Sequence, residues 1–285
     1  MNAEAGAQAG PDAIAMTDPA AADAAARARA GDRRKPWFLR LARSYVRRQV
    51  ATELDGLWVR GLAPARAAQA QGPVLFVANH VAWWDPMLVL LLDAALGSEG
   101  WAVMDAQSLR KLPFLGWVGG LPLDRSGPAT SRAGLEAAAA LLDRPGRGLW
   151  IFPQGRQRPA HVRPLDLKPG VRLLHACAPV DVITVSFNYI FLEQSRPAAM
   201  VRFSAPLPGA AVGGRALLGA IEASLLDGLA EIDAAALVAT DGRQAALQPH
   251  APLPDFEPLV LPRSVASHQG AGGRLLRRLG GGAPA

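Results

Sequence analysis

The sequence predicts an α/β fold in which a largely parallel central sheet is flanked by helices. Two observations support this prediction: short apolar runs alternate with helical stretches from about residue 72, and 50% of the 285 residues are hydrophobic. The apolar runs are nearly continuous, as in strands that are buried on both faces. A chain of this length can bury one substantial core, so we expect one main domain with flanking segments.

The alternating part of the chain contains five candidate strands and several candidate helices. The strands are short runs rich in branched and aromatic residues, whereas the helices are longer stretches rich in Ala and Leu. In chain order we expect a strand at 74–78, a helix at 86–96, a strand at 101–104, a helix at 131–142, a strand at 149–152, a helix at 170–177, strands at 182–187 and 200–203, and one or two helices over 217–238. We assign this α/β domain to residues 71–240.

The two ends of the chain differ from this domain in composition. Residues 1–32 are Ala-rich, slightly acidic and almost free of large apolar side chains, and residues 241–285 are rich in Pro and Gly. Such segments cannot bury enough apolar surface to offset the entropy lost on ordering. We therefore predict a disordered N-terminal tail and a mostly unordered C-terminal tail.

Residues 33–70 begin with a strongly basic segment, RRKPWFLRLARSYVRRQV, which contains no acidic residue. Helical spacing places Trp37, Phe38, Leu41, Tyr45 and Val46 along one side and Arg40, Arg43 and Arg47 on the other. A basic amphipathic helix with aromatic residues is typical of segments that lie in a membrane interface. The alternative is a helix that packs on the domain and exposes its basic face to water.

Composition also limits the kinds of binding partner and the subcellular locations that we expect. The net charge of +6 suggests an anionic partner, such as a membrane surface, a nucleic acid or a phosphorylated substrate. The single cysteine, Cys177, excludes an intramolecular disulfide and a Cys-based zinc cluster. The N-terminus lacks the features of a secretory signal, and no apolar stretch approaches the roughly 20 residues of a membrane-spanning helix. We expect a peripheral protein on the cytoplasmic side of the membrane.

The stretch VANHVAWWDP places a histidine directly after a predicted strand and an aspartate five residues later. Asp85 followed by Pro86 has the pattern of a helix start, so Asp85 could simply be an N-cap. The same strand-to-helix turn can also fold the carboxylate of Asp85 back onto the imidazole of His80, which would orient a general base. The residues of this stretch leave both interpretations open.

Two later loops carry arginines at the same expected edge of the sheet. The stretch LPLDRSG exposes Arg125, and LWIFPQGRQRP is a predicted strand that ends at Pro153 and is followed by Gly155, Arg156 and Arg158. Glycine permits close approach of the backbone, and guanidinium groups bind phosphate in a bidentate manner. These loops therefore predict an anion site beside the histidine, whereas solvated arginines in an ordinary turn are the alternative.

In this order the motifs resemble those of the glycerolipid and lysophospholipid acyltransferases, typified by the 1-acylglycerol-3-phosphate acyltransferases. The resemblance covers residues 70–205. The family's NHxxxxD motif is matched by Asn79, His80 and Asp85; its Asp-Arg motif is similar to LPLDR at 121–125; its FPEGTRS motif is similar to FPQGRQ at 152–157; and its apolar segment around a proline is similar to APV at 178–180.

The resemblance implies a reaction and a site. An acyl group moves from acyl-CoA or acyl carrier protein, as co-substrate, to a hydroxyl of a lysophospholipid or related lipid, with no cofactor and no metal. His80 is the general base and Asp85 orients it. The implied substrate-binding residues are Asn79, Arg125, Gln154, Gly155, Arg156 and Arg158.

The sequence departs from the family pattern at two positions. Gln154 stands where the family has Glu, and Arg156 follows the glycine directly. Because a carboxylate beside the anion site is missing, the identity of the acceptor is less certain than the class of reaction. It also leaves open a non-catalytic, lipid-binding membrane protein with a degenerate site.

Other classes fit the sequence less well. A serine hydrolase would need the G-x-S-x-G elbow, and a nucleotide-binding protein would need a Walker or G-x-G-x-x-G motif, none of which occurs. Nor is there a nucleic-acid-binding module, so we expect no nucleic-acid partner. The expected partners are an anionic membrane surface, the lipid acceptor and the acyl donor.

Overall fold

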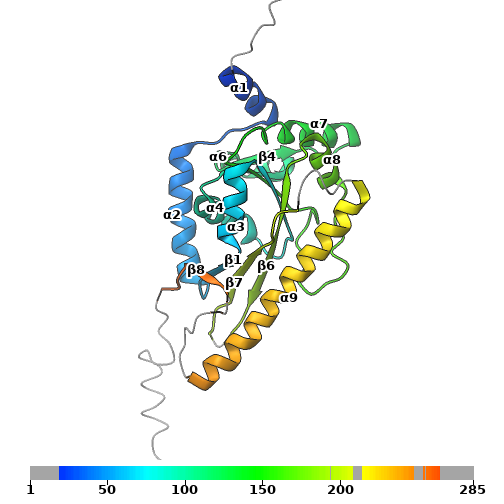
Figure 1. Ribbon diagram of the computed structural model, residues 1–285. Coiled ribbons are helices and arrows are strands. Elements are labelled where there is room, and N and C mark those ends of the chain that lie inside the picture. The colour runs from blue at the N-terminus through cyan, green and yellow to red at the C-terminus, as the bar shows by residue number, and fades with distance from the viewer. Residues whose placement is uncertain (1–18, 193, 208–213, 247–252, 254, 264–285) are drawn as a thin grey trace, which may run out of the picture.

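The computed structural model describes residues 19–192, 194–207, 214–246, 253 and 255–263. These residues contain a mixed sheet of eight strands with helices on both faces (Figure 1). The strands are β1 (Leu57–Arg60), β2 (Val74–Ala78), β3 (Glu99–Asp105), β4 (Gly120–Leu123), β5 (Arg147–Ile151), β6 (Asp181–Ile190), β7 (Ala198–Phe203) and β8 (Glu257–Val260). The helices are α1 (Pro19–Ala30), α2 (Pro36–Glu53), α3 (Leu62–Gln71), α4 (Asp85–Leu96), α5 (Ala106–Lys111), α6 (Phe114–Trp117), α7 (Pro128–Ala139), α8 (Gly170–Cys177) and α9 (Gly214–Ala246).

The sheet has the order β4-β3-β5-β2-β6-β7-β1-β8. The first five strands in this order are mutually parallel, which confirms the predicted α/β fold with a largely parallel sheet. β7 is antiparallel to β6, and β1 follows the direction of β7. The reversal arises because only seven residues, 191–197, join β6 to β7, which is too short for a parallel crossover.

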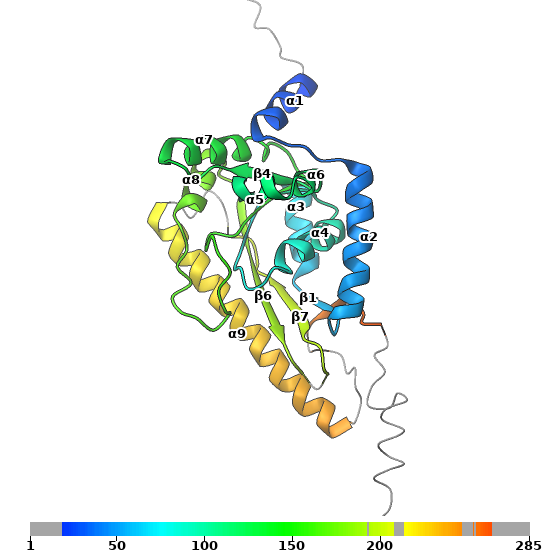
Figure 2. The ribbon, with the colours of Figure 1, turned by 180° about the vertical axis from the view of Figure 1, so that it is seen from behind.

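Alternation along the central strands divides the core into two layers. Leu75 and Val77 of β2 belong to the apolar cluster beneath α7, α8 and α9, whereas Phe76 and Ala78 belong to the cluster beneath α2, α3 and α4. Figures 1 and 2 show these two groups of helices on opposite sides of the sheet. Because both faces are covered, the central strands are apolar throughout, as their sequence predicts.

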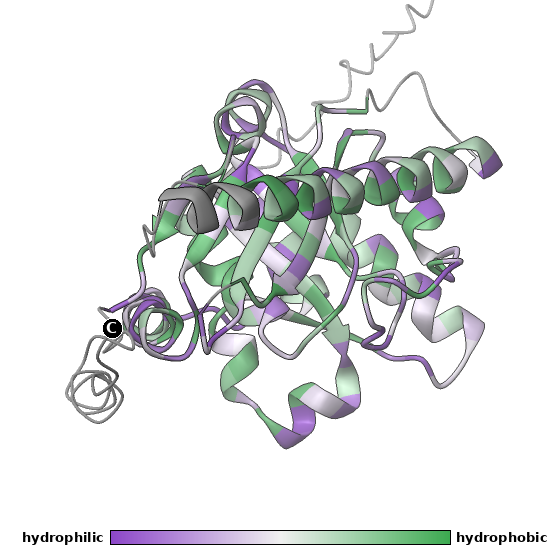
Figure 3. Cartoon of the chain, turned by 90° about the horizontal axis from the view of Figure 1, so that it is seen from below, coloured by the Kyte–Doolittle hydropathy of each residue, from purple (hydrophilic) through white to green (hydrophobic). Residues whose placement is uncertain are grey.

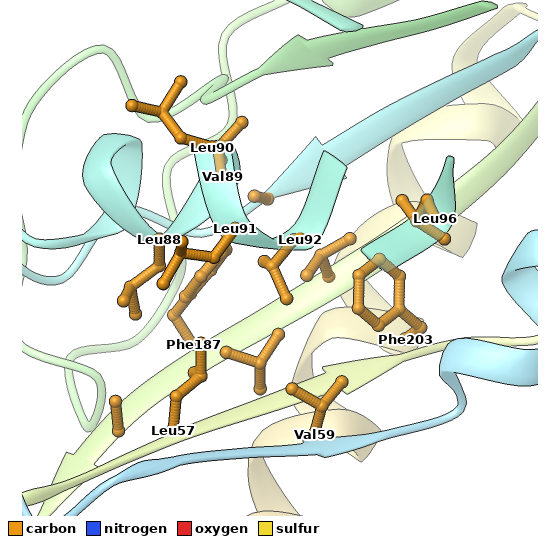
Figure 4. Packing of buried hydrophobic residues seen from close by; sticks show 14 of the residues in the cluster. Leu57, Val59, Leu88, Val89, Leu90, Leu91, Leu92, Leu96, Phe187 and Phe203 are labelled. Carbon is orange, nitrogen blue, oxygen red and sulfur yellow. The ribbon is translucent and has the colours of Figure 1, made fainter. Parts of the chain in front are cut away.

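Helix α4 lies between the sheet and α2. Its leucines Leu88, Leu91 and Leu92 are buried, and Figure 4 shows them close to Phe187 of β6 and to residues of β7 and β1. On its outer side, the Arg43 guanidinium of α2 donates a hydrogen bond to the Leu90 carbonyl (3.1 Å). Because α4 is covered on two sides, it is hydrophobic almost all round.

The long helix α9 crosses the other face of the sheet. Its buried residues recur at helical spacing: Leu217, Ile221 and Leu225 join the cluster of α7 and α8, and Ile232 joins a third cluster beneath β1 and β7. In Figure 3 its hydrophobic and hydrophilic residues alternate along the chain, as in a helix that covers a core with one face.

The structure corrects the predicted boundary at residue 70. Residues 33–70 were assigned to a membrane-interface region, but β1 and α3 lie within them and belong to the α/β fold. Strand β1 was not predicted; it is a short segment between the helices α2 and α3. The stretch 120–123 was likewise expected to be a loop, and it forms β4 at the edge of the sheet, where Pro122 is tolerated.

The structure also corrects the predicted tails. Disorder was expected through residue 32, yet residues 19–30 form α1, because Ala26 and Ala30 enter the core and Asp23 and Arg27 form ion pairs with β-strand residues. At the other end, α9 continues to Ala246, and β8 pairs with β1 within the expected C-terminal tail. The remaining parts of both predicted tails lie largely outside the described residues.

Candidate active site

The motif residues meet at the carboxyl edge of the parallel strands. β2 ends at Ala78 and is followed by the loop that carries His80, while its neighbour β5 ends at Ile151 and is followed by the loop that carries Gln154. The two loops are joined directly, because the Arg158 N–H donates to the His80 carbonyl (2.8 Å). Sites of open α/β sheets form at this edge.

His80 and Asp85 form a hydrogen-bonded pair. The Nδ1 atom of His80 lies 2.8 Å from Oδ2 of Asp85, which also accepts the backbone N–H groups of Val81 (2.6 Å) and Ala82 (3.0 Å). Asp85 Oδ1 accepts the hydroxyl of Tyr189 (2.6 Å). The carboxylate is fully buried, and these four donors compensate its charge.

The helix begins at Asp85 itself, and its N-cap is Trp84, which makes no side-chain cap bond. Of the two interpretations left open for Asp85, the structure does not support the N-cap: its carboxylate reaches back to the loop residues Val81 and Ala82. The Asp85 carboxylate holds both the backbone of this loop and the His80 imidazole in place.

The Asp85 carboxylate selects the tautomer of His80. A carboxylate only accepts, so the Nδ1 atom carries the hydrogen and the Nε2 atom keeps its lone pair. The imidazole packs against the Phe152 ring, with 4.9 Å between the centroids, and lines a cavity. This geometry permits Nε2 to act as a general base toward a group in the cavity.

Asn79 and Gln154 support the loop from within the protein. The Asn79 amide donates to the Phe187 carbonyl (3.0 Å) and accepts its N–H (2.7 Å), which ties the end of β2 to β6. The Gln154 amide accepts the His80 N–H (2.6 Å) and donates to the Leu165 carbonyl (3.0 Å). Both side chains are buried, so the structure places them behind the cavity wall.

The two roles of Gln154 give a physical reason for its departure from the family pattern. An ionised Glu could accept the His80 N–H but could not donate to the Leu165 carbonyl, and its charge would be buried. An amide satisfies both partners and carries no charge. The residue is therefore accommodated by its surroundings, and nothing in its contacts indicates a degenerate site.

A cavity of about 310 Å³ opens beside His80. Its apolar wall is formed by strands β3, β4 and β5 and by helices α7 and α8, with Val103, Met104, Leu123, Leu135, Ile151 and Val171. Its charged lining residues are Asp105, Arg125, Arg156 and Lys168. A site with one apolar side and a few charged groups suits an amphipathic ligand.

The three cations on the cavity are loosely held. Arg125 lies 3.2 Å from Asp105, Arg156 lies 3.8 Å from Asp166, and Lys168 lies 2.9 Å from Asp166. Each cation is more than half exposed. The Lys168 ammonium lowers the pKa of Asp166, so that carboxyl stays ionised and keeps its partners.

Gly155 permits the close approach of Arg125. Its φ of +66° lies in the left-handed region, and a Cβ there would lie 3.2 Å from an Nη atom of Arg125. Arg158 is different from the other cations, because its side chain is largely buried and donates to the Leu165 carbonyl (3.0 Å). The structure thus places Gly155, Arg125 and Arg156 on the cavity and Arg158 in the supporting loop.

Sequence reasoning missed three residues of this region: Asp105, Lys168 and Tyr189. Lys168 is one of three lysines in the chain and directly precedes the Pro-Gly start of α8, which is a weak indication of a special position. Tyr189 is one of two tyrosines and is separated from Asp85 by 104 residues. Their proximity to the motifs depends on strand order, which the motifs do not specify.

Comparison with known proteins shows similarity to acyltransferases in sequence motif and in fold. A crystal structure of the 1-acyl-sn-glycerophosphate (LPA) acyltransferase PlsC from Thermotoga maritima is similar in fold, with a TM-score of 0.53 and 17% identity over 78% of this chain and 85% of that chain. Among curated proteins, none matches significantly. The family model described as Acyltransferase matches residues 59–188, which run from the end of β1 to most of β6 and contain every motif residue. The match thus places residues 59–188 in the acyltransferase family, as the motifs predict.

Proposed function

We propose that the protein transfers a fatty acyl group from a thioester donor to a hydroxyl of a lysophospholipid or related lipid. The observation that carries this proposal is the His80–Asp85 pair, which leaves Nε2 free at the wall of a cavity with three accessible cations. The donor is acyl-CoA or an acyl carrier protein. The acceptor is a lipid with an anionic headgroup.

In the proposed mechanism, Nε2 of His80 takes the proton from the acceptor hydroxyl as its oxygen attacks the thioester carbonyl. The tetrahedral intermediate then collapses, the C–S bond breaks, and the leaving thiolate receives the proton from His80. Asp85 holds the imidazole and stabilises its protonated form. General-base catalysis of this kind contributes about 10²–10⁴-fold, and positioning supplies much of the rest.

The anionic group of the acceptor binds Arg125 and Arg156, with Lys168 as a third cation. All three line the cavity with His80. The hydroxyl to be acylated would then lie toward Nε2, and the apolar wall would receive a hydrocarbon chain. Arg158 supports the loop instead, because it does not line the cavity and donates to the Leu165 carbonyl.

We further propose that α2 holds the protein at an anionic membrane surface on the cytoplasmic side. Val46 and Val50 are buried, whereas Trp37, Leu41 and Tyr45 are each more than half exposed and follow one another at four-residue intervals. The exposed Arg40, Arg47 and Arg48 lie on the same helix. The helix packs on the domain with one side and presents an aromatic and basic surface with the other.

This surface differs from the predicted one, because Val46 turns inward and Phe38 is half-buried against Trp117. The helix packs on the domain, as the alternative interpretation predicts, and its exposed apolar residues support the proposed membrane surface. Within the described part of the chain, no helix has the length and hydropathy that a membrane span requires.

Purified protein with a panel of lysophospholipids tests the reaction, using long-chain acyl-CoA and acyl carrier protein as alternative donors. Thiol release and product mass are measured for the wild type, His80→Ala and, as control, His161→Ala, which alters an exposed histidine. We expect His80→Ala to lose 10²–10⁴-fold in kcat and His161→Ala to retain it. Equal rates for His80→Ala and the wild type would show that His80 is not the base.

Sedimentation with vesicles that contain anionic phospholipid tests the membrane surface. Replacement of Trp37, Leu41 and Tyr45 by Ser should weaken binding by about a thousandfold, because about 1.5 kcal/mol is lost for each of the three large apolar side chains. The control replaces Leu237 and Val238, which are exposed on α9. If both variants bind like the wild type, α2 is not the attachment surface.

A further inference from the structure

Tyr189 lies beside the proposed catalytic pair although no motif contains it. It is the ninth of the ten residues of β6, and its ring packs against the core cluster beneath α2 and α4. Phe187, two residues earlier on the strand, is the residue that Asn79 binds. The same end of β6 therefore anchors the backbone before His80 and contacts the carboxylate of Asp85.

The hydrogen bonds to Asp85 are distributed unevenly between its two oxygens. Oδ2 accepts three donors, from His80, Val81 and Ala82, whereas Oδ1 accepts the Tyr189 hydroxyl as its one hydrogen bond among the described residues. A carboxylate held at only one oxygen can rotate about its terminal bond. The bond at Oδ1 fixes this rotation and keeps Oδ2 directed at the imidazole.

The Tyr189 hydroxyl has the protonation state that this role needs. Burial, together with the nearby Asp85 carboxylate, raises the pKa of Tyr189 well above its ordinary value. The hydroxyl therefore remains a donor throughout the pH range of an ordinary enzyme. It lies behind Asp85 and not on the cavity wall, so it acts on the substrate only through Asp85 and His80.

We infer that Tyr189 is a positioning residue for the acyl transfer proposed above, forming a Tyr189–Asp85–His80 relay with the base at its far end. The inference rests on that proposed function. The bond to Oδ1 stabilises the buried carboxylate and withdraws part of its negative charge from the imidazole. Without this bond, Oδ1 would be buried without a donor. The carboxylate would then keep more negative charge and attract the protonated imidazole more strongly.

Tyr189→Phe tests the relay because it keeps the ring and removes one oxygen. Its matched control is Ser186→Ala, which also removes a buried hydroxyl from β6, one that donates to the Leu225 carbonyl (2.9 Å) on the side of α9. Thermal unfolding of both variants measures the structural cost. Each loses one hydrogen bond, so we expect similar, modest losses of stability.

We expect Tyr189→Phe to lower kcat about tenfold with little change in KM, the size of one hydrogen bond to a charged group. The acid limb of its pH–rate profile should move to higher pH, because the imidazole holds its proton more tightly. In the background of Asp85→Asn, the same substitution should have almost no further effect. Ser186→Ala should show neither the loss of kcat nor the movement of the acid limb.

The relay is refuted if Tyr189→Phe matches Ser186→Ala in kcat and pH profile, or if its effect adds fully to that of Asp85→Asn. NMR of the His80 ring supplies a readout that does not depend on turnover. The Nδ1–H resonance and the pH at which the ring gains its proton should change in Tyr189→Phe and not in Ser186→Ala. If the wild type shows no transfer, the proposed function fails, and the NMR comparison alone then supports or overturns the relay.

Discussion

The two edges of the sheet carry clusters of cations that differ in how their charge is used. At the amino edge, where β3 and β5 begin with Glu99 and Arg147, the Trp101 ring is covered by Arg34 at 3.8 Å and by Arg27 and Arg147 at 5.2 Å each. At the carboxyl edge, Arg125, Arg156 and Lys168 surround the cavity. Three cations cover the ring and three line the cavity, yet only the cations on the cavity are suited to bind a ligand.

The cations of the amino edge are neutralised by the protein. The Arg147 side chain is 1% exposed and bonds to Asp23, Glu99 and Asp143 as well as to the Leu141 carbonyl. Four acids, Asp23, Asp32, Glu99 and Asp143, pair there with these three arginines and with a fourth, Arg144. This cluster attaches α1 to the sheet, and its acids neutralise the arginines that cover Trp101.

The cations of the carboxyl edge have fewer acidic residues beside them and are more exposed to solvent. Asp105 and Asp166 hold them at the cavity, and each cation remains more than half exposed. An incoming anion can therefore replace a weak internal pair at little cost. The comparison teaches that burial and the number of neighbouring acids, more than the number of arginines, distinguish a binding cluster from a structural one.

The largest expected effect is on stability, at the amino edge. Arg147→Met should lower the free energy of unfolding by about 3 kcal/mol, because it leaves partly buried acids without their partner. Arg132→Met, which breaks an exposed Arg132–Glu136 pair on α7, should cost about 0.5 kcal/mol or less. Urea unfolding measures both. A small loss for Arg147→Met would mean that the two clusters are energetically alike.

An intermediate effect is expected on binding, at the carboxyl edge. Arg156→Gln and Lys168→Gln should each raise KM for the acceptor about tenfold, which corresponds to about 1.4 kcal/mol, and leave the urea midpoint unchanged. Arg66→Gln removes an exposed cation from α3, on the opposite face of the sheet, and should not alter KM. If the cavity variants lose stability and retain KM, their cations are structural too.

The smallest expected effect is a pH dependence at the amino edge. Hydrogen bonds from Arg147 and Arg27 lower the pKa of Asp23 from 3.8 to about 2, so its ionised form stabilises the folded state. That contribution, about 1 kcal/mol, is present above pH 4 and is lost as the pH falls toward 2.

Unfolding of Asp23→Asn and the wild type at several pH values measures this contribution. The difference between them should be full at pH 6 and shrink below pH 4, whereas Asp227→Asn, at an exposed site on α9, should give a smaller difference at pH 6. A constant difference down to pH 2 would mean that Asp23 gains nothing from its charge.

The motifs predicted the edge of the sheet at which these residues meet. They did not predict which side chains line the cavity and which support its loops. Of the eight residues inferred from the resemblance, His80, Arg125, Gly155 and Arg156 line the cavity. The other four, Asn79, Asp85, Gln154 and Arg158, lie behind it and support the loops. Their burial depends on contacts with Phe187, Tyr189 and Leu165, which are distant in the chain, and a local pattern does not record such contacts.

The sequence by itself determined the α/β class, the parallel core, the edge at which the motif residues meet and the likeness of residues 59–188 to acyltransferases. These features follow from the spacing of apolar residues and from motifs in which the reacting groups are close in the chain. Only the tertiary structure decided that Asp85 orders the His80 loop instead of capping a helix, that Lys168 and Tyr189 join the site, and that the arginines near Trp101 are neutralised. Strand order and burial set these outcomes, because both arise from contacts between residues far apart in the sequence.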